Sequence, residues 1–532
     1  MCAAAISGGC TMNLANQAQR LLAGMATDSF GDFSASLYET GRVAALAPLL
    51  QGHEGRIRFL LHEQGSDGSW GGPGEYALLP TLSATEALFT ELSRTADTRV
   101  GTAVHRGLEA LFAKLGGEVS LPDTVAIELL VPWLVSALNT HLAALETKPL
   151  PGLEIWRDGK RLPCPGGTYP ELLVHLREAV EHGAVLPEKL WHSLEMLGPL
   201  AQGASFVRAG RFGVGCSPAA TAAWFGTGAR RGNPHPGVRY LEQVQARHGG
   251  PVPVAAPLDV FERAWVLTTF TDVGLPVAVP FELVEGLRSA FGESGVAGGA
   301  GLPPDADDTS TALHALANLG MPYPLDSLWE YQVDEHFSTF PEERTPSVTT
   351  NAHVLQALAA YPRGDRRTAD TMLGLTEWLC GQQHADGSWT DKWHASPYYA
   401  TATCVVALAG CGESTAAERK AVRWVLETQH ANGAWGFWDG TTEETAFAVQ
   451  ILLRAKGIRP DAAIEQAAAR GCSYLLEAGD APSPPLWHDK DLYTPGRIVR
   501  AETIAALHVA GTNPRVAARL ARSHAERAGR TA

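Results

Sequence analysis

The sequence predicts an all-α protein, because three observations agree. Alternating Val, Ile and Thr runs long enough for strands are scarce, whereas apolar residues recur at helical spacing, as in 354–358 and 447–452. Gly and Pro interrupt these segments at short intervals, as expected for helix pairs joined by tight turns. The third observation is a local pattern that occurs three times along the chain.

Each copy of this repeat reads aromatic-aliphatic-x3-Gln-x3-Gly-x-Trp. The three copies are Gln64-Gly68-Trp70, Gln383-Gly387-Trp389 and Gln429-Gly433-Trp435. The last two are separated by the length of one helical hairpin, which is typical of stacked helix pairs. We expect the Gln side chain to tie neighbouring helix ends, the Gly to make a left-handed turn and the Trp to seal that turn by burial. The repeat is therefore structural rather than catalytic.

The positions of the repeats and of one segment rich in Gly and Pro predict two helical domains. The first copy stands alone, and residues 292–304 form the stretch richest in Gly and Pro. We expect residues 51–250 to form one domain and residues 251–532 to form the other. Residues 1–50 are predicted to be a tail and a helix that packs on the second domain.

Composition excludes some classes of protein. Lys and Arg total 42 against 57 Asp and Glu, a net charge of −15 that argues against nucleic-acid binding. The eight cysteines include no C-x-x-C pair, so they are expected to be reduced thiols of a cytoplasmic protein. The most apolar segment, 125–138, is short for a membrane span and contains Glu128 and Pro132, so no integral membrane segment is expected.

Three carboxylates crowd the predicted start of a helix, at Asp305, Asp307 and Asp308. Helix capping explains one or two of them, but not three within four positions, where mutual repulsion should be destabilising. A calcium loop is disfavoured, because the Gly and the distal Glu of an EF-hand are absent. Carboxyl groups this close cannot all ionise freely, so one is expected to keep its proton and to serve as a general acid.

Aromatic side chains gather in two other segments and could line a dry cavity. Those predicted to line the substrate are Trp393, Tyr398, Tyr399 and Trp438. Ordinary core packing is the alternative for each ring. Because ring faces stabilise cations, an acid that faces such a cavity suits protonation of an alkene followed by a carbocation cascade.

The aspartate cluster and the repeat together resemble the class II terpene cyclases. Further stretches narrow the resemblance to the bacterial diterpene cyclases: Gly301-Leu302-Pro303-Pro304, Asn351-Ala352-His353, Asp391-Lys392-Trp393, Ser396-Pro397-Tyr398-Tyr399, Glu443-Glu444-Thr445-Ala446 and Lys490-Asp491-Leu492-Tyr493-Thr494-Pro495. The similarity covers most of the chain, from about residue 36 to about residue 500.

The resemblance implies two α/α-barrel domains, called γ and β in the family, with the active site between them. Asp307 would donate the proton, and Asp305 and Asp308 would orient it and tune its acidity. The substrate would be a linear prenyl diphosphate, normally geranylgeranyl diphosphate, cyclised to a bicyclic labdane, clerodane or halimane type of diphosphate. Farnesyl diphosphate, which would give a drimane-type product, is the alternative. Neither magnesium motif of the ionising class I cyclases is present, which agrees with a retained diphosphate.

A retained diphosphate needs cations. Lys490, Arg497 and Arg500 lie close together in sequence and could supply them, although a solvated surface cluster is the alternative. The resemblance also implies Mg²⁺ bound with the diphosphate. Glu75 lies where relatives carry acidic residues, but it has no adjacent Asp.

The base that ends the cascade is predicted to be His353, alone or with a water held by Asn351; a structural histidine is the alternative. A downstream class I terpene synthase and a homodimer are the expected partners. Three other functions remain open: a squalene-type triterpene cyclase, an α/α-toroid glycosidase or lyase, and a non-catalytic helical scaffold. The glycosidase is disfavoured because its two carboxylates must come from separate segments.

Overall fold

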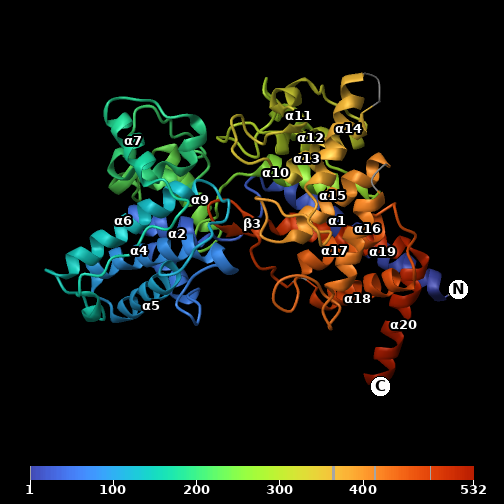
Figure 1. The fold of residues 1–532 in the computed structure, drawn as a ribbon, viewed down its shortest axis with the longest axis horizontal. Coiled ribbons are helices and arrows are strands. Elements are labelled where there is room, and N and C mark those ends of the chain that lie inside the picture. The colour runs from blue at the N-terminus through green and yellow to red at the C-terminus, as the bar shows by residue number, and fades with distance from the viewer. Residues whose placement is uncertain (1, 362–365, 413–414, 480, 532) are drawn as a thin grey trace.

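The computed structural model describes residues 2–361, 366–412, 415–479 and 481–531. It consists of two helical lobes side by side, joined at a narrow waist where the hairpin strand β3 lies (Figure 1). Each lobe has its own hydrophobic core. The predictions of an all-α fold and of two α/α-barrel domains are confirmed.

The first barrel has an inner ring of five helices. Each contacts the next, and the last contacts the first, which closes the ring. The inner helices are α2 (Leu37–Leu46), α4 (Leu78–Thr95), α6 (Ile127–Leu145), the kinked 3₁₀ segment η3 (Glu188–Ala201) and α8 (Pro218–Phe225). The outer helices are α3 (His53–His62), α5 (Thr98–Leu115), α7 (Pro170–Glu181) and α9 (Pro236–Ala246).

The second barrel is built in the same way with six inner helices, and α19 contacts α10 to close it. The inner helices are α10 (Asp259–Asp272), α12 (Ala306–Asn318), α13 (Val348–Ala360), α15 (Pro397–Cys411), α17 (Thr442–Arg454) and α19 (Gly496–Thr512). The outer helices are α11 (Phe281–Ala290), α14 (Arg366–Gly381), α16 (Thr415–Glu427), α18 (Ala462–Ala478) and α20 (Pro514–Thr531).

Short elements complete the chain. Two antiparallel hairpins pair β1 (Gln332–Val333) with β2 (His336–Phe337) and β3 (Trp487–His488) with β4 (Leu492–Tyr493). The short 3₁₀ turns are η1 (Gly74–Ala77), η2 (Glu154–Trp156), η4 (Gly226–Gly228) and η5 (Asp326–Tyr331). The β3–β4 hairpin belongs to the second barrel in sequence but reaches the first, and it helps to form the site described below.

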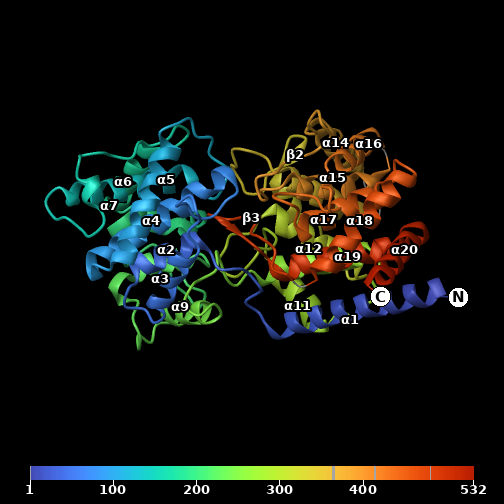
Figure 2. The ribbon, with the colours of Figure 1, turned by 90° about the horizontal axis from the view of Figure 1, so that it is seen from below.

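The helix α1 (Cys2–Thr27) runs along the second barrel, against α11, α19 and α20 (Figure 2). The predicted domain boundary at residue 50 is wrong, however. The helix α2 packs between α4 and α8 inside the first barrel, so that domain begins near residue 37. Ser36 caps this helix by accepting a hydrogen bond from the Glu39 amide.

The three repeats have the same geometry. In each, the Gln side-chain amide donates to the Gly carbonyl of its own turn and to an alanine carbonyl of the following outer helix, all at 2.9 Å. The Trp indole N–H donates to a carbonyl ten residues before it, at 2.6 to 2.8 Å. In the second copy, Gly387 has φ +103°, and a Cβ there would lie 2.5 Å from the Lys420 carbonyl oxygen. The repeat therefore ties one helical hairpin to the next.

Among the described residues, the helix α6 alone is long and apolar enough to cross a membrane by length and composition. It is longer than the apolar segment considered in the sequence, but 56% of its apolar stretch is buried. Its neighbours in the ring, α4 and η3, cover it, so it is a core helix of the first barrel.

Candidate active site between the two barrels

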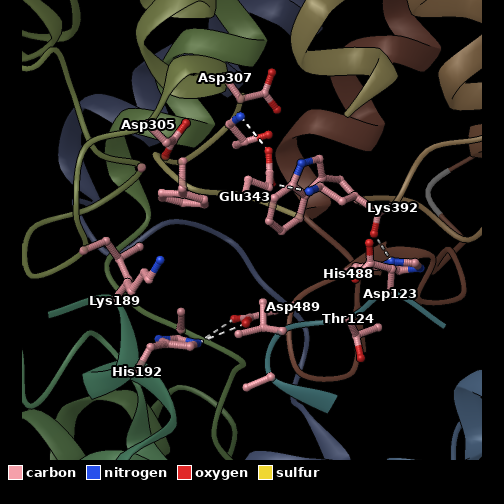
Figure 3. A pocket seen from close by; sticks show the side chains of 18 of the residues that line it. Asp123, Thr124, Lys189, His192, Asp305, Asp307, Glu343, Lys392, His488 and Asp489 are labelled. Carbon is pink, nitrogen blue, oxygen red and sulfur yellow. Dashed lines mark hydrogen bonds and ion pairs between the residues drawn. The ribbon is translucent and has the colours of Figure 1, made fainter. Parts of the chain in front are cut away.

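A cavity of about 410 Å³ lies between the barrels and is lined by both. The first barrel contributes residues 123–129 and 189–193. The second contributes the start of α12, the loop 339–345, the loop before α15 and the β3–β4 hairpin. Asp305 and Asp307 lie toward one end of the cavity in Figure 3, and His192 and Asp489 lie toward the other.

The aspartate cluster reaches the cavity because α12 begins at its wall. Asp305 is the N-cap of α12, with its Oδ1 accepting a hydrogen bond from the Asp308 amide at 2.8 Å. Asp307 and Asp308 follow in the first turn, and all three carboxyl groups line the cavity. Capping therefore accounts for Asp305 only.

Asp307 is held from behind by a histidine of the neighbouring inner helix. Its Oδ1 lies 2.7 Å from Nδ1 of His353 on α13. The His353 ring packs edge-on against Trp265, with ring centroids 5.2 Å apart. None of the described residues forms a hydrogen bond with Oδ2 of Asp307, and Asp307 lines the cavity.

Burial changes the protonation of the other two aspartates. It raises the pKa of Asp305 to about 7. Burial, together with the charge of Asp305, raises the pKa of Asp308 well above its usual value. Oδ1 of Asp308 is buried without a hydrogen-bond partner among the described residues. This pair of carboxyl groups therefore carries at least one proton at neutral pH.

Aromatic rings form much of the remaining wall. Those that line the cavity are Phe261, Trp265, Phe340, Trp393, Tyr399, Trp487 and Tyr493. Four of them are in contact: ring centroids are 4.5 Å apart for Phe261 and Trp265, 5.6 Å for Phe261 and Trp487, and 4.7 Å for Trp487 and Tyr399. Such a wall excludes water and presents π faces to a cation.

Two of the four predicted lining residues, Trp393 and Tyr399, are in this wall, and the other two are not. The Tyr398 hydroxyl donates to the Thr428 side chain at 2.7 Å, on the side of α15 away from the cavity. Trp438 is 60% exposed and lies outside the cavity. Neighbouring residues on a helix face different directions, which the sequence clusters did not resolve.

Three lysine and arginine side chains line the cavity: Lys189 from the first barrel, and Arg344 and Lys392 from the second. Lys189 forms no ion pair with the described residues, and Figure 3 shows it beside the cavity. Lys392 pairs with Glu343, and Arg344 lies 3.2 Å from Glu128 across the domain boundary. Lys392 lies in the Asp391-Lys392-Trp393 motif, but nothing in the sequence indicates a role for any of the three.

Comparisons with known proteins agree with this geometry. Residues 342–497 match the family described as squalene-hopene cyclase C-terminal domain. The chain is 46% identical over 497 residues to ent-copalyl diphosphate synthase of Streptomyces sp. (strain KO-3988), covering 92% of this chain and 95% of that protein. The chain belongs to the bacterial class II diterpene cyclases.

A further relative and a solved structure support the assignment of this chain to the family. The chain is 42% identical over 510 residues to labda-7,13-dienyl diphosphate synthase of Streptomyces clavuligerus, covering 92% of each chain. The solved structure of ent-copalyl diphosphate synthase from Streptomyces platensis superimposes with a TM-score of 0.89 at 43% identity, covering 93% of this chain and 99% of that one. These relatives are named for different diphosphate products.

The prediction that Lys490 binds the diphosphate is wrong. This side chain is fully buried, and its Nζ contacts Glu39 at 2.6 Å, Glu195 at 2.8 Å and Ser217 at 2.8 Å. Burial opposes the charge, but the two glutamates raise the pKa of Lys490 above its usual value. Lys490 joins the barrels and does not line the cavity.

The two arginines predicted to bind the diphosphate also lie away from the cavity. Arg497 pairs with Glu262 at 2.7 Å and with Asp28 at 2.9 Å, which fastens α19 to α10 and to the end of α1. Arg500 is exposed on α19 and is not among the lining residues. Closeness in sequence placed these cations together, but the helix turns them onto different surfaces.

The predicted base residues of the cyclase have structural contacts instead. Asn351 is fully buried, accepts a hydrogen bond from the Phe337 amide at 2.7 Å and donates to the Phe337 and Ser347 carbonyls. Both ends of its amide are thus occupied. His353 contacts Asp307, so it lies at the acid end of the cavity and positions the acid. These contacts contradict a part for Asn351 in the terminating base and give His353 a structural role beside the acid.

A histidine that sequence analysis missed forms a charged pair at the other end of the cavity. His192 Nδ1 lies 2.6 Å from the Gly215 carbonyl, which can only accept, so this nitrogen carries a hydrogen. Its Nε2 lies 3.0 Å from Asp489. Burial opposes the charge, but the Asp489 carboxylate raises the pKa of His192 overall. The pair links the two barrels, because His192 lies in η3 and Asp489 lies in the β3–β4 turn.

Glu75, the predicted metal residue, lies outside the cavity. Glu75 lies in η1, and its half-exposed carboxylate is 3.5 Å from Lys114. No group of three or more His, Cys, Asp or Glu side chains suited to a metal ion occurs among the described residues. The described residues therefore offer no cage for a resident Mg²⁺. A Mg²⁺ ion held mainly by the diphosphate needs only one or two carboxylates, so Mg²⁺ stays a prediction, and no catalytic step below depends on it.

Proposed function

We propose that this cyclase converts geranylgeranyl diphosphate into a bicyclic diphosphate and retains the diphosphate group. The observation that carries the proposal is the aspartate cluster, which opens into an aromatic cavity with Asp307 backed by His353. The relatives named as copalyl and labdadienyl diphosphate synthases support the substrate class.

Asp307 would start the reaction. With His353 Nδ1–H donating to Oδ1, the transferable proton resides on Oδ2, which forms no hydrogen bond with the described residues. The π electrons of the distal double bond take this proton and form a C–H bond, and the resulting cation is attacked by the next double bond to close each ring. Loss of a proton from carbon ends the cascade, so one proton enters the hydrocarbon and one leaves it. The buried and partly protonated Asp305–Asp308 pair limits negative charge beside Asp307, which favours proton release.

The diphosphate would bind near Lys189, Arg344 and Lys392. Lys189 is not paired with any described residue, and Lys392 can exchange Glu343 for a phosphate oxygen without leaving its place. We also propose that the cyclase works in the cytoplasm and that a class I terpene synthase consumes its product, since the retained diphosphate is the leaving group which that reaction class needs. A homodimer stays a prediction.

The test is product analysis of the purified protein. Geranylgeranyl diphosphate with Mg²⁺ as its counter-ion should give a bicyclic diphosphate, detected by mass spectrometry as an alcohol after phosphatase treatment. Farnesyl diphosphate and squalene, assayed in parallel, distinguish the alternative substrates. Absence of turnover with both prenyl diphosphates would contradict the proposal.

Asp307→Asn should lower turnover by roughly 10²- to 10⁴-fold, because the amide cannot supply the proton. Its unfolding midpoint should stay close to that of the wild type, since the amide oxygen still accepts the His353 hydrogen bond. If the variant retains full activity, Asp307 is not the acid.

A further inference from the structure

Two adjacent acidic residues begin α17, and the function described so far uses neither. Glu443 and Glu444 are both buried, with exposures of 0% and 1%. They belong to the motif Glu443-Glu444-Thr445-Ala446, for which the sequence indicates no role. Their contacts differ, and the difference shows what Glu443 can do.

Glu443 has no cationic partner among the described residues. Its Oε1 accepts from the Trp487 indole N–H at 2.5 Å and lies 3.4 Å from His394 Nε2. Nδ1 of His394 accepts from the Ser396 amide at 3.0 Å, so the hydrogen of this ring is on Nε2 and the histidine is neutral. Two N–H groups that converge on one oxygen stabilise the ionised carboxylate.

The second oxygen of Glu443 is unsatisfied. Oε2 is buried without a hydrogen-bond partner among the described residues. A buried carboxylate that lacks both a cation and a full set of donors is destabilising for the fold. A charge kept at such a cost directly behind the wall of a catalytic cavity indicates a use in the reaction.

The place of Glu443 indicates that use. Trp487, whose indole N–H donates to Glu443, lines the cavity. Its ring centroid lies 4.7 Å from that of Tyr399, which also lines the cavity. His394 stacks on Tyr399 at 4.9 Å. Glu443 itself does not line the cavity, so one layer of rings separates its charge from the substrate.

We propose that Glu443 is a fixed negative charge behind the aromatic wall that stabilises the carbocations formed in front of it. The N–H bond to the carboxylate increases the electron density of the Trp487 ring, which strengthens the attraction of its face for a cation. The charge also acts directly across a water-free wall of low dielectric. Glu443 touches no substrate, so it acts as a positioning residue; the inference rests on the proposed cyclisation.

Glu444 is the matched control. Its oxygens accept from the Ser396 hydroxyl at 2.5 Å, the Thr441 hydroxyl at 2.8 Å and the Phe437 amide at 2.9 Å. These contacts fasten the start of α15 and the loop before α17, and none of them involves a ring that lines the cavity. Glu444→Gln therefore removes a buried glutamate of the same helix turn without changing the charge behind Trp487.

The test compares two inhibitors of the same shape. One is an analogue of geranylgeranyl diphosphate in which a protonated amine replaces the carbon that first becomes cationic, and the other is its neutral carbon isostere. Glu443→Gln keeps the acceptor for Trp487 but removes the charge. We expect it to weaken binding of the ammonium analogue relative to the isostere by about tenfold or more, and to lower kcat with little change in KM.

Calorimetric Kd values for both inhibitors, with unfolding midpoints, decide the outcome. An unchanged ratio in folded Glu443→Gln, or an equal change in Glu444→Gln, overturns the proposal. If Glu443→Gln does not fold, Trp487→Phe retains a ring but removes the N–H link and should lower the same ratio; an unchanged ratio there also overturns it. Failure of the wild type to turn over prenyl diphosphates would refute the proposed cyclisation itself, and the product analysis described above detects that failure independently of the binding measurements.

Discussion

Asp305, Asp307 and Asp308 occupy one turn of α12, yet each has a different environment. Asp305 caps the helix, Asp307 faces His353, and Asp308 has a buried oxygen without a partner. Because of these different environments, Asp305 and Asp308 can share protons while Asp307 is left to act on the substrate. The burial of Asp305 and Asp308 also lowers the stability of the folded protein at high pH, where these carboxyl groups ionise.

Asp305→Asn tests whether ionisation of the buried Asp305 lowers the stability of the fold. Folded Asp305 keeps its proton up to about pH 7 because burial raises its pKa, whereas the unfolded chain loses that proton near pH 4. Between these pH values the folded state binds a proton that the unfolded state has lost, so wild-type stability falls as pH rises. Asn retains the cap but does not titrate. The variant should therefore gain stability relative to the wild type, by up to about 4 kcal/mol above pH 7.

Urea unfolding at pH 4, 5.5 and 8 measures this difference. The advantage of Asp305→Asn should be small at pH 4 and should level off above pH 7. An advantage that is the same at all three pH values would show that Asp305 titrates normally in the folded protein.

The acid site could be predicted from sequence because its three carboxyl groups lie within four positions of one segment. Lys490, Arg497 and Arg500 were assigned by the same logic, and the structure places them elsewhere. Lys490 lies in a hairpin turn and contacts Glu39 and Glu195 of the first barrel, which are far away in sequence. Lys189 and Arg344 could not be found, because they reach one cavity from separate domains.

At the scale of elements, the three repeats fasten successive hairpins through one glutamine each. Gln383 joins its own turn at Gly387 to α16 at Ala417, with two bonds of 2.9 Å. The repeat predicted these ties, because its residues are local and their hydrogen-bonding groups are fixed by type. The membership of α2 in the first barrel has no such signal, since no repeat precedes it.

Gln383→Ala should lower the free energy of unfolding by about 1–3 kcal/mol, because two buried carbonyl groups lose their donor. The neighbouring Gln382→Ala is the control: its side chain is exposed, so its effect should stay within about 0.5 kcal/mol. Denaturant unfolding of both variants gives the comparison. Equal effects would mean that the repeat does not hold the hairpins together.

At the scale of the whole molecule, the active site exists only where two barrels meet. The cavity takes its acid from one barrel and part of its opposite wall from the other. The β3–β4 hairpin makes the junction, with Asp489 reaching His192 and Lys490 reaching Glu39 and Glu195. No single segment encodes this interface, so its geometry could not be read from the sequence.

Lys490→Met tests the junction. Loss of the ammonium group leaves Glu39 and Glu195 buried without their cation, which should cost about 3–5 kcal/mol of stability. The KM for the prenyl diphosphate should change little in the protein that remains folded, because Lys490 does not line the cavity. A large rise in KM at unchanged stability would return Lys490 to the diphosphate site.

The central claim is that Asp307 gives a proton to the hydrocarbon end while the diphosphate stays attached. Turnover of geranylgeranyl diphosphate in D₂O, followed by mass spectrometry of the intact product, tests it most directly. A product that carries one deuterium on carbon and an intact diphosphate is expected, and Asp307→Asn should form almost none. A product without deuterium, or release of inorganic diphosphate, would contradict the account.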